Sequence, residues 1–154
     1  MIQSVAPASS RSKSQALVLG HFKGKSLSRA CMIHEEDGRL ANALKRTEAS
    51  GDLGSVTEVF EVGDYDRVLV VGLGEEKKFD EGAFRKVAAA AGRRLDAAGI
   101  ERVTACFAGP IESSHVDANL AGVAFGEGLG LLAFDKTVYK GSASNKPTSN
   151  KLAV

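Results

Sequence analysis

Two glycines that follow a buried apolar run are the first candidates for a functional site, because their spacing could form a phosphate-binding turn. The segment 68–71 is an unbroken apolar run typical of a strand covered on both faces, and Gly72-Leu73-Gly74 follows it directly. A Gly-x-Gly turn after such a strand resembles the beginning of a dinucleotide-binding turn. The third glycine of that motif is absent because Lys77 stands in its place, and the chain has no Gly-x-x-x-x-Gly-Lys-Ser/Thr phosphate loop. We therefore favour a plain strand-to-loop turn over a phosphate site.

Acidic and histidine side chains are the candidates for metal binding or proton transfer. His34 precedes the acidic run 35–37, but no second histidine completes a zinc-binding His-Glu-x-x-His helix, and His21 and His115 are far away in the sequence. Three successive acids point in different directions on a helix and are typical of a solvated first turn. The chain also has no Gly-x-Ser-x-Gly elbow for a serine nucleophile. We expect no catalytic residue, no cofactor-binding residue and no metal ligand in this chain.

A basic helix face is the candidate for binding nucleic acid. Four cations lie on the polar side of one predicted helix: Arg85, Lys86, Arg93 and Arg94. The whole chain has 20 Lys and Arg against 19 Asp and Glu, so its formal charge of +1 creates no large field that attracts nucleic acid or an anionic membrane. Aromatic residues make up only 6%, too few for a surface that stacks single-stranded bases. We favour a solvated face, with weak DNA contact as the alternative.

The elements that must position these residues alternate between strands and helices. Apolar residues repeat at three- and four-residue steps over 80–98, where Asp80 is a cap and Gly99 a stop, which predicts a helix. The pattern predicts strands at 2–6, 16–20, 56–62, 68–71 and 102–108, and further helices at 37–49, capped by Asp37, and at 115–134. We expect the strand 68–71 to be central and the strand 56–62 to be antiparallel or at an edge. We expect Gly109-Pro110 to end the strand 102–108. Strand, helix and strand of these lengths imply a right-handed parallel crossover and an α/β fold.

Glycines interrupt the last predicted helix at regular intervals. Gly122, Gly126 and Gly130 are four residues apart and therefore share one face. Each costs up to ~1 kcal/mol relative to Ala, and a backbone that packs closely against that face would offset the cost. We favour close packing inside the domain, with a contact to another subunit or domain as the alternative.

Length and composition favour one domain. A chain of 154 residues with 44% hydrophobic and 25% charged residues can bury a core without a disulfide or metal. Cys31 and Cys106 are far apart beside apolar runs, so we interpret them as buried free thiols in a reducing compartment. No leader pattern and no run near the ~18 residues of a membrane span is present, and we expect a cytoplasmic protein without a membrane partner.

The composition changes near the C-terminal end. After an α/β domain over 1–135, the segment 136–154 loses apolar periodicity and is rich in Lys, Ser, Asn and Thr, which is typical of a linker. Its last residues, Leu152-Ala153-Val154, resemble the start of a new strand. We therefore expect that the chain was cut from a longer polypeptide.

Three segments taken together resemble the N-terminal domain of the leucyl aminopeptidases, also called cytosol aminopeptidases, whose bacterial members include aminopeptidase A. The first is the strand ending in Gly72, Leu73 and Gly74, followed by the helix with Phe84-Arg85-Lys86-Val87. The second is the last helix, with Gly122, Gly126, Glu127 and Gly128, leading to Phe134, Asp135 and Tyr139-Lys140. The third is the polar linker. The resemblance spans essentially the whole chain, and it departs where Leu132 replaces a frequent tyrosine and Thr137-Val138 lengthen the last stretch.

This resemblance implies a macro-domain-like three-layer sandwich, with a mixed, mostly parallel sheet flanked by helices. It also implies that the whole enzyme removes N-terminal residues, preferentially leucine, from peptides with two divalent metals, manganese or zinc. The family's metal ligands lie in a C-terminal catalytic domain whose Asn-Thr-Asp-Ala-Glu-Gly-Arg-Leu motif is absent here. We therefore expect an inactive domain whose partners are that catalytic domain and the other subunits of a homo-hexamer, and which supports assembly and access.

Two alternatives remain beside this interpretation. One is a macro-like module that binds a nucleotide such as ADP-ribose through Gly72-Leu73-Gly74. The other is a DNA-binding accessory domain that uses the basic face, since some bacterial relatives in this family bind DNA.

Overall fold

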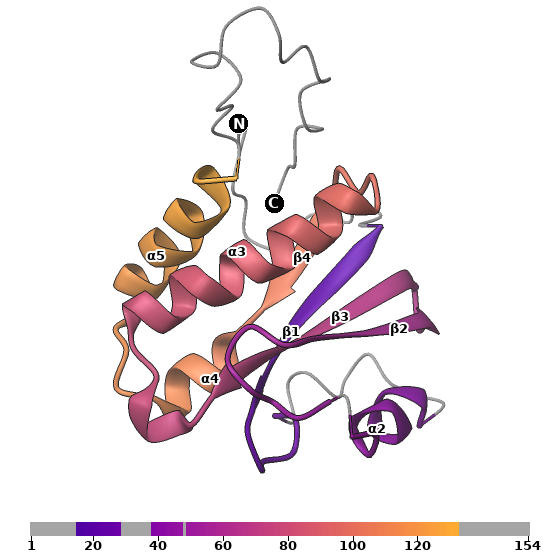
Figure 1. Cartoon of the computed structure of the whole chain (residues 1–154), viewed down its shortest axis with the longest axis horizontal. Helices are drawn as coiled ribbons and strands as arrows, with labels where there is room; N and C mark the ends of the chain where they lie inside the picture. Colours follow the sequence, from indigo (N-terminus) through magenta and orange to yellow (C-terminus); the bar gives the residue numbers. More distant parts are fainter. Residues whose placement is uncertain (1–14, 29–37, 48, 133–154) are drawn as a thin grey trace, which may run out of the picture.

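The computed structural model describes residues 15–28, 38–47 and 49–132 (Figure 1). The strand predicted at 2–6, the acidic run 35–37, Cys31 and the Phe134-Asp135 motif lie outside these residues. In chain order the elements are β1 (Ala16–Phe22), α2 (Arg39–Leu44), β2 (Val56–Val62), β3 (Tyr65–Gly74), a short 3-10 helix η1 (Glu76–Lys78), α3 (Glu81–Ala97), β4 (Val103–Cys106), α4 (Ala108–Ser113) and α5 (Ala118–Gly130).

The strands form one mixed sheet in the order β2-β3-β1-β4. β1 pairs in parallel with both β3 and β4, whereas β2 pairs antiparallel with β3 through a tight turn after Val62. β3 is central and its Val68–Val71 segment is buried, because neighbouring elements cover both of its faces. The predictions of an α/β fold, a central strand at 68–71 and an antiparallel edge strand at 56–62 are confirmed.

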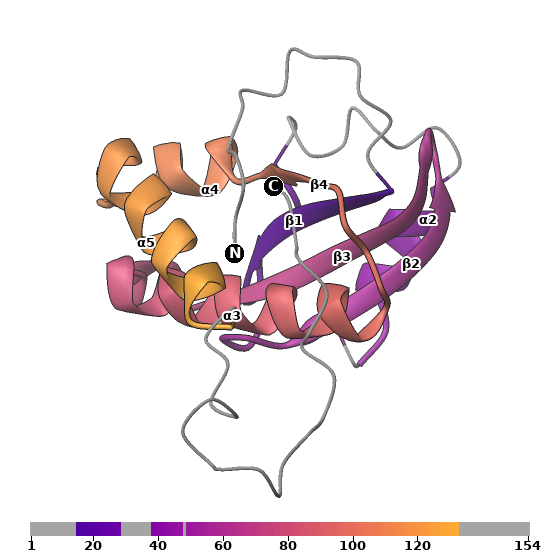
Figure 2. The same ribbon diagram turned by 90° about the horizontal axis from the view of Figure 1, so that it is seen from above.

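Helices cover both faces of this sheet, which gives three layers. α3 and α5 lie over one face and α2 lies over the other (Figures 1 and 2). The α3 side holds the larger cluster of buried apolar side chains, centred on Phe84, Val87 and Leu95. The α2 side holds a smaller cluster in which Leu40 packs with Leu17 and Leu19 of β1.

α3 has the ends that its sequence predicts. The Asp80 side chain accepts a hydrogen bond from the amide of Ala83 at 2.6 Å, and Gly99 follows the helix with a φ of +68°. Its buried residues are Ala83, Phe84, Val87, Ala88, Ala90, Ala91, Gly92 and Leu95. The prediction of a capped amphipathic helix here is confirmed.

Two shorter helices differ from their predictions. α2 spans six residues instead of the whole segment 37–49, and its N-cap is Gly38, in the left-handed region with a φ of +67°, rather than Asp37. Gly109 and Pro110 were expected to end a strand, but they lie in the first turn of α4. Proline is compatible with a first turn because the amide it lacks has no partner in the helix there.

The glycines of α5 overturn the expectation of close packing inside the domain. A Cβ placed on Gly122, Gly126 or Gly130 would have no described atom within 4 Å. Gly128 is the glycine of this helix that packs closely, since a Cβ there would lie 2.5 Å from the carbonyl oxygen of Arg85 and 2.7 Å from the Cβ of Ala88. The close approach of α5 to α3 therefore depends on Gly128, and the three regularly spaced glycines face outward.

Candidate functional site

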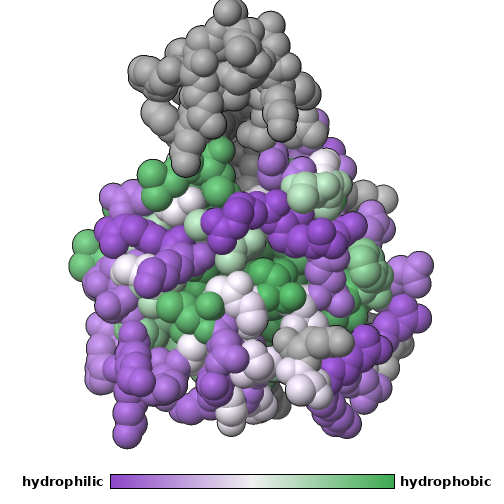
Figure 3. All heavy atoms as spheres, in the orientation of Figure 1, coloured by the Kyte–Doolittle hydropathy of each residue, from purple (hydrophilic) through white to green (hydrophobic). Residues whose placement is uncertain are grey.

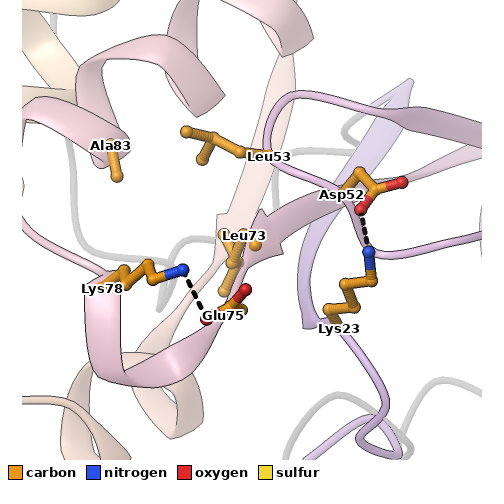
Figure 4. Close-up of a pocket in the computed structure, with 8 residues that line it drawn as sticks. Lys23, Asp52, Leu53, Leu73, Glu75, Lys78 and Ala83 are labelled. Carbon is orange, nitrogen blue, oxygen red and sulfur yellow. Dashed lines mark hydrogen bonds and ion pairs between the residues drawn. The ribbon is translucent and has the colours of Figure 1, made fainter.

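A cavity lies beyond the carboxyl ends of two adjacent parallel strands, β1 and β3. In α/β folds this edge of the sheet is where ligands usually bind. The cavity has a volume of about 230 Å³. Its lining comes from the residue after β1, the loop before β2, the end of β3 and the beginning of α3: Lys23, Asp52, Leu53, Leu73, Gly74, Glu75, Lys78 and Ala83 (Figure 4).

Two ion pairs flank this cavity. Lys23 Nζ lies 2.6 Å from Asp52 Oδ1, and Lys78 Nζ lies 2.9 Å from Glu75 Oε2. The hydrogen bond with Asp52 raises the pKa of Lys23, and the same bond lowers the pKa of Asp52. The hydrogen bond from Lys78 likewise lowers the pKa of Glu75. The cavity therefore carries two ammonium groups and two carboxylates that neutralise one another, and it has no excess of positive charge for a phosphate.

The glycine turn on which the phosphate hypothesis rested is occupied by backbone pairing. The amide of Gly72 donates to the carbonyl oxygen of Ser55 at 2.8 Å, and the amide of Gly74 donates to that of Gly51 at 2.9 Å. A Cβ on Gly72 would collide with the carbonyl oxygen of Asp52 and the hydroxyl of Ser55. These glycines hold the loop 51–55 against β3, so their amides are not available to a phosphate.

A further set of contacts fastens the residues that follow β1. His21 is the buried polar residue among those described, and its Nε2 lies 2.5 Å from the carbonyl oxygen of Lys25. The ammonium group of Lys25 pairs with Glu76, and this bond, followed by one from Ser113, lowers the pKa of Glu76. These contacts tie the end of β1 to η1 and α4.

The predicted basic face lies on the exposed side of α3, where Figure 3 shows hydrophilic side chains. Two of its four cations are held by acids. Arg85 Nε lies 2.5 Å from Glu127 Oε2 on α5, and Arg94 Nη2 donates to Glu58 Oε2 on β2 at 2.9 Å. Over residues 15–28, 38–47 and 49–132, Lys86 and Arg93 have no such partner. The face is therefore about half neutralised.

No metal site forms among the described residues. No group of three or more His, Cys, Asp or Glu side chains in this part of the chain could hold a metal ion. The described residues therefore do not fit a two-metal centre, and we derive no catalytic step from them. Nor is any helix within the described ranges long and apolar enough to cross a membrane.

Spacing alone gives little indication of the cavity residues. Lys23, Asp52 and the pair Glu75 and Lys78 come from three separate segments of the chain, and the one signal is that Lys23 and Glu75 each directly follow a strand. Cys106 is partly buried, whereas it was expected to be buried. The motif residues Gly122, Gly126, Glu127 and Gly128 lie on α5.

Comparison with known proteins decides the family. Residues 18–142 match the sequence model of the cytosol aminopeptidase family, N-terminal domain. The chain belongs to this family. The resemblance carried by Gly72-Leu73-Gly74 and the α5 motif is thereby confirmed.

Curated relatives of the family extend far beyond this domain. The chain is 31% identical over 93 residues to a probable cytosol aminopeptidase of Thioalkalivibrio sulfidiphilus and 32% identical over 93 residues to one of Halorhodospira halophila. A third, of Burkholderia pseudomallei, is 34% identical over 96 residues. These matches cover 58 to 60% of this chain but only 19% of each relative. The chain thus spans about a fifth of the length of these relatives.

Solved structures share the fold at low sequence identity. The bottromycin maturation enzyme BotP superimposes with a TM-score of 0.63 and 18% identity, over 92% of this chain and 27% of that one. BotP has also been solved in complex with manganese. A tomato leucine aminopeptidase variant superimposes with a TM-score of 0.64 and 15% identity, over 93% of this chain and 29% of that one.

Proposed function

We propose that this chain is the non-catalytic N-terminal domain of a metal-dependent leucyl aminopeptidase, which as a whole enzyme removes N-terminal residues, preferentially leucine, from peptides. The observation that carries this proposal is the family match over residues 18–142, together with the 19% of each curated relative that the chain covers. A two-metal centre needs several oxygen ligands around two ions, and the described residues provide no such group. The two divalent metals, manganese or zinc, would therefore bind in the catalytic domain.

The role that we propose for the domain is to support assembly of a cytoplasmic homo-hexamer and access to its active site. The relatives are named cytosol aminopeptidases, which supports a cytoplasmic location. The partners would be the catalytic domain of the same polypeptide and the neighbouring subunits. The cavity beyond β1 and β3 supports a structural role, since the Lys23–Asp52 pair joins the end of β1 to the loop 51–55 and the Lys78–Glu75 pair lies within the connection from β3 to α3, which leaves none of these charges free for a ligand.

The aminopeptidase proposal is tested by comparing the activity of this chain with that of a polypeptide that also carries a catalytic domain. Hydrolysis of leucine p-nitroanilide is measured with added Mn²⁺ or Zn²⁺ for this chain and for a polypeptide in which a cytosol aminopeptidase catalytic domain follows residue 154. We expect hydrolysis by the longer polypeptide alone, in hexameric form. Hydrolysis by the 154-residue chain would overturn the non-catalytic assignment. An equally active hexamer after deletion of residues 1–135 would overturn the role in assembly and access.

A nucleotide-binding role is tested separately by titrating the chain with ADP-ribose in a calorimeter. We expect no binding heat at micromolar ligand, because the amide of Gly72 donates to the carbonyl oxygen of Ser55 and the amide of Gly74 donates to that of Gly51. A saturable heat that is lost when Lys23 and Lys78 are replaced by Ala would favour the nucleotide-binding alternative over the aminopeptidase domain.

A further inference from the structure

One side of α5 exposes large apolar side chains. Leu120, Val123 and Leu131, the last directly after the helix, are 52%, 56% and 71% exposed, and they are three of the five large apolar residues that are exposed in the described part of the chain. The opposite side of α5 packs on α3, and Figures 1 and 2 show α5 at the margin of the molecule. Contiguous exposed apolar groups on a single helix are typical of an interaction surface.

The glycines on this side are unexplained within the domain. Gly122, Gly126 and Gly130 follow the apolar side chains along the outer face, and a Cβ at any of them would meet no described atom within 4 Å. A solvated helix gains stability when glycine is replaced by alanine. The absence of side chains at every fourth position instead leaves a shallow groove along the helix, into which a neighbouring helix can fit closely.

The charges near this side do not oppose its burial by another copy. Glu127 is the ionised side chain on the exposed arc of the helix, and its carboxylate already binds Arg85 of α3 at 2.5 Å. The chain has a formal charge of +1, so two copies repel each other only weakly. Because Arg85 and Glu127 are already paired within each copy, neither leaves an uncompensated charge beside this side of α5.

We propose that this face of α5, defined by Leu120, Gly122, Val123, Gly126, Gly130 and Leu131, binds the same face of a second copy of this chain. The order of glycine and apolar residues along this face is nearly the same on either side of Gly126. In an antiparallel crossing centred there, Gly122 of one copy faces Gly130 of the other, and Leu120 lies near Leu131. A two-fold contact requires such self-complementarity. This proposal deepens the assembly role given above and rests on it.

The pairing is weak, since a single helix crossing buries less than the roughly 1,000 Å² of a stable interface. We therefore expect dissociation in the micromolar range or above, and sedimentation equilibrium of the 154-residue chain from about 10 µM to about 1 mM covers that range. We expect a reversible monomer–dimer equilibrium. Leu120→Glu and Gly126→Leu should each weaken it at least tenfold, the first by burying a charge and the second by filling the groove. Phe60→Glu is the matched control, because Phe60 on β2 is also 52% exposed.

Melting temperatures of dilute samples show whether a variant has lost the folded structure or only the contact between copies. Gly126→Leu should melt at or above the parent temperature, because the position is open in the described part and leucine favours helix. Gly128→Ala should melt lower because Gly128 lies against α3.

Three results would overturn the proposal. They are a parent that stays monomeric throughout, a dimer that Leu120→Glu and Gly126→Leu leave intact, and a lower melting temperature for Gly126→Leu, which would mean that other residues of the same chain cover the face. None of these changes the outcome of the leucine p-nitroanilide test, so failure of this inference is distinguishable from failure of the aminopeptidase proposal.

Discussion

Glu58 on β2 is an acid that the fold places against two arginines. Its side chain is only 13% exposed and binds Arg94 of α3 and Arg67 of β3, the latter at 3.0 Å. The guanidinium of Arg67 also lies 4.9 Å from the centre of the Phe60 ring. Replacing Glu58 by Gln leaves two arginines without their anion, and we expect a loss of about 2 kcal/mol in the free energy of unfolding at pH 7. Urea denaturation measures it, and Glu75→Gln is the control because that exposed pair should contribute little.

The same residue gives a pH dependence. The hydrogen bond from Arg94, aided by the charge of Arg67, lowers the pKa of Glu58 from its usual 4.5. A carboxyl whose pKa is lower in the folded state stabilises the fold above the unfolded pKa, and this contribution is lost as the pH falls from 4.5 through the folded value. The difference in stability between the parent and Glu58→Gln should therefore shrink below pH 4.5. A difference that stays constant down to pH 3 would contradict this account.

Gly72 shows what could and could not be inferred at the residue scale. The sequence places it correctly at the end of a buried strand, but the reason for a glycine there is the loop 51–55, which comes from a distant part of the chain. We expect Gly72→Ala to destabilise the domain by about 3 kcal/mol, because a Cβ would collide with the backbone of Asp52. Thermal melting measures this, with Gly122→Ala as the control. An unchanged melting temperature for Gly72→Ala would show that the loop moves away freely.

At the scale of elements, the cap of α3 is the clearest local signal. We expect Asp80→Ala to lower the free energy of unfolding by about 1 kcal/mol, because the amide of Ala83 loses its acceptor. Asp80→Asn keeps an acceptor oxygen and should retain most of the stability, which urea denaturation can resolve. Equal losses in both variants would mean that the charge, rather than the hydrogen bond, is what matters at this position.

Elements were predictable where one periodicity dominates, and β2 shows why prediction fails elsewhere. Strict alternation would place Val56, Phe60 and Val62 on one face, yet Phe60 is 52% exposed whereas Val62 is buried beside Val59. Between them Glu61 has a φ of +57°, and its carbonyl oxygen accepts a hydrogen bond from Arg39. This left-handed residue reverses the phase of the strand. A short sequence window contains no sign of it, because Arg39 belongs to α2.

At the scale of the whole molecule, strand pairing brings together residues that no local pattern relates. The cavity residues Lys23, Asp52 and Glu75 meet because β1 lies beside β3 and the loop 51–55 folds over their ends. The outward side of α5 was predicted to be internal, since the glycine spacing indicates close packing but not which molecule provides it. Sequence patterns thus predicted the α/β fold and the family resemblance implied its layers, whereas the ion pairs depended on the topology.

The ion pairs of the arginines on α3 limit the affinity of the molecule for DNA. Arg85 and Arg94 are bound by Glu127 and Glu58, which leaves Lys86 and Arg93 as the members of the predicted face without an acidic partner in the described residues. Two phosphate contacts on a duplex correspond to a slope of about −2 in log K against log salt concentration. We therefore expect DNA binding that is weak and non-specific, with a dissociation constant of about 10⁻⁴ M or above at physiological salt.

Fluorescence anisotropy of a labelled duplex, titrated with the chain over a salt series, measures both quantities. Replacing Lys86 and Arg93 together by Ala should abolish the residual binding. Replacing Arg85 by Ala should change it little, since its guanidinium is committed to Glu127. A slope steeper than about −5 would require more phosphate contacts than these two side chains can make. It would assign DNA binding to cations outside this face, and the accessory role in DNA binding would then rest on them.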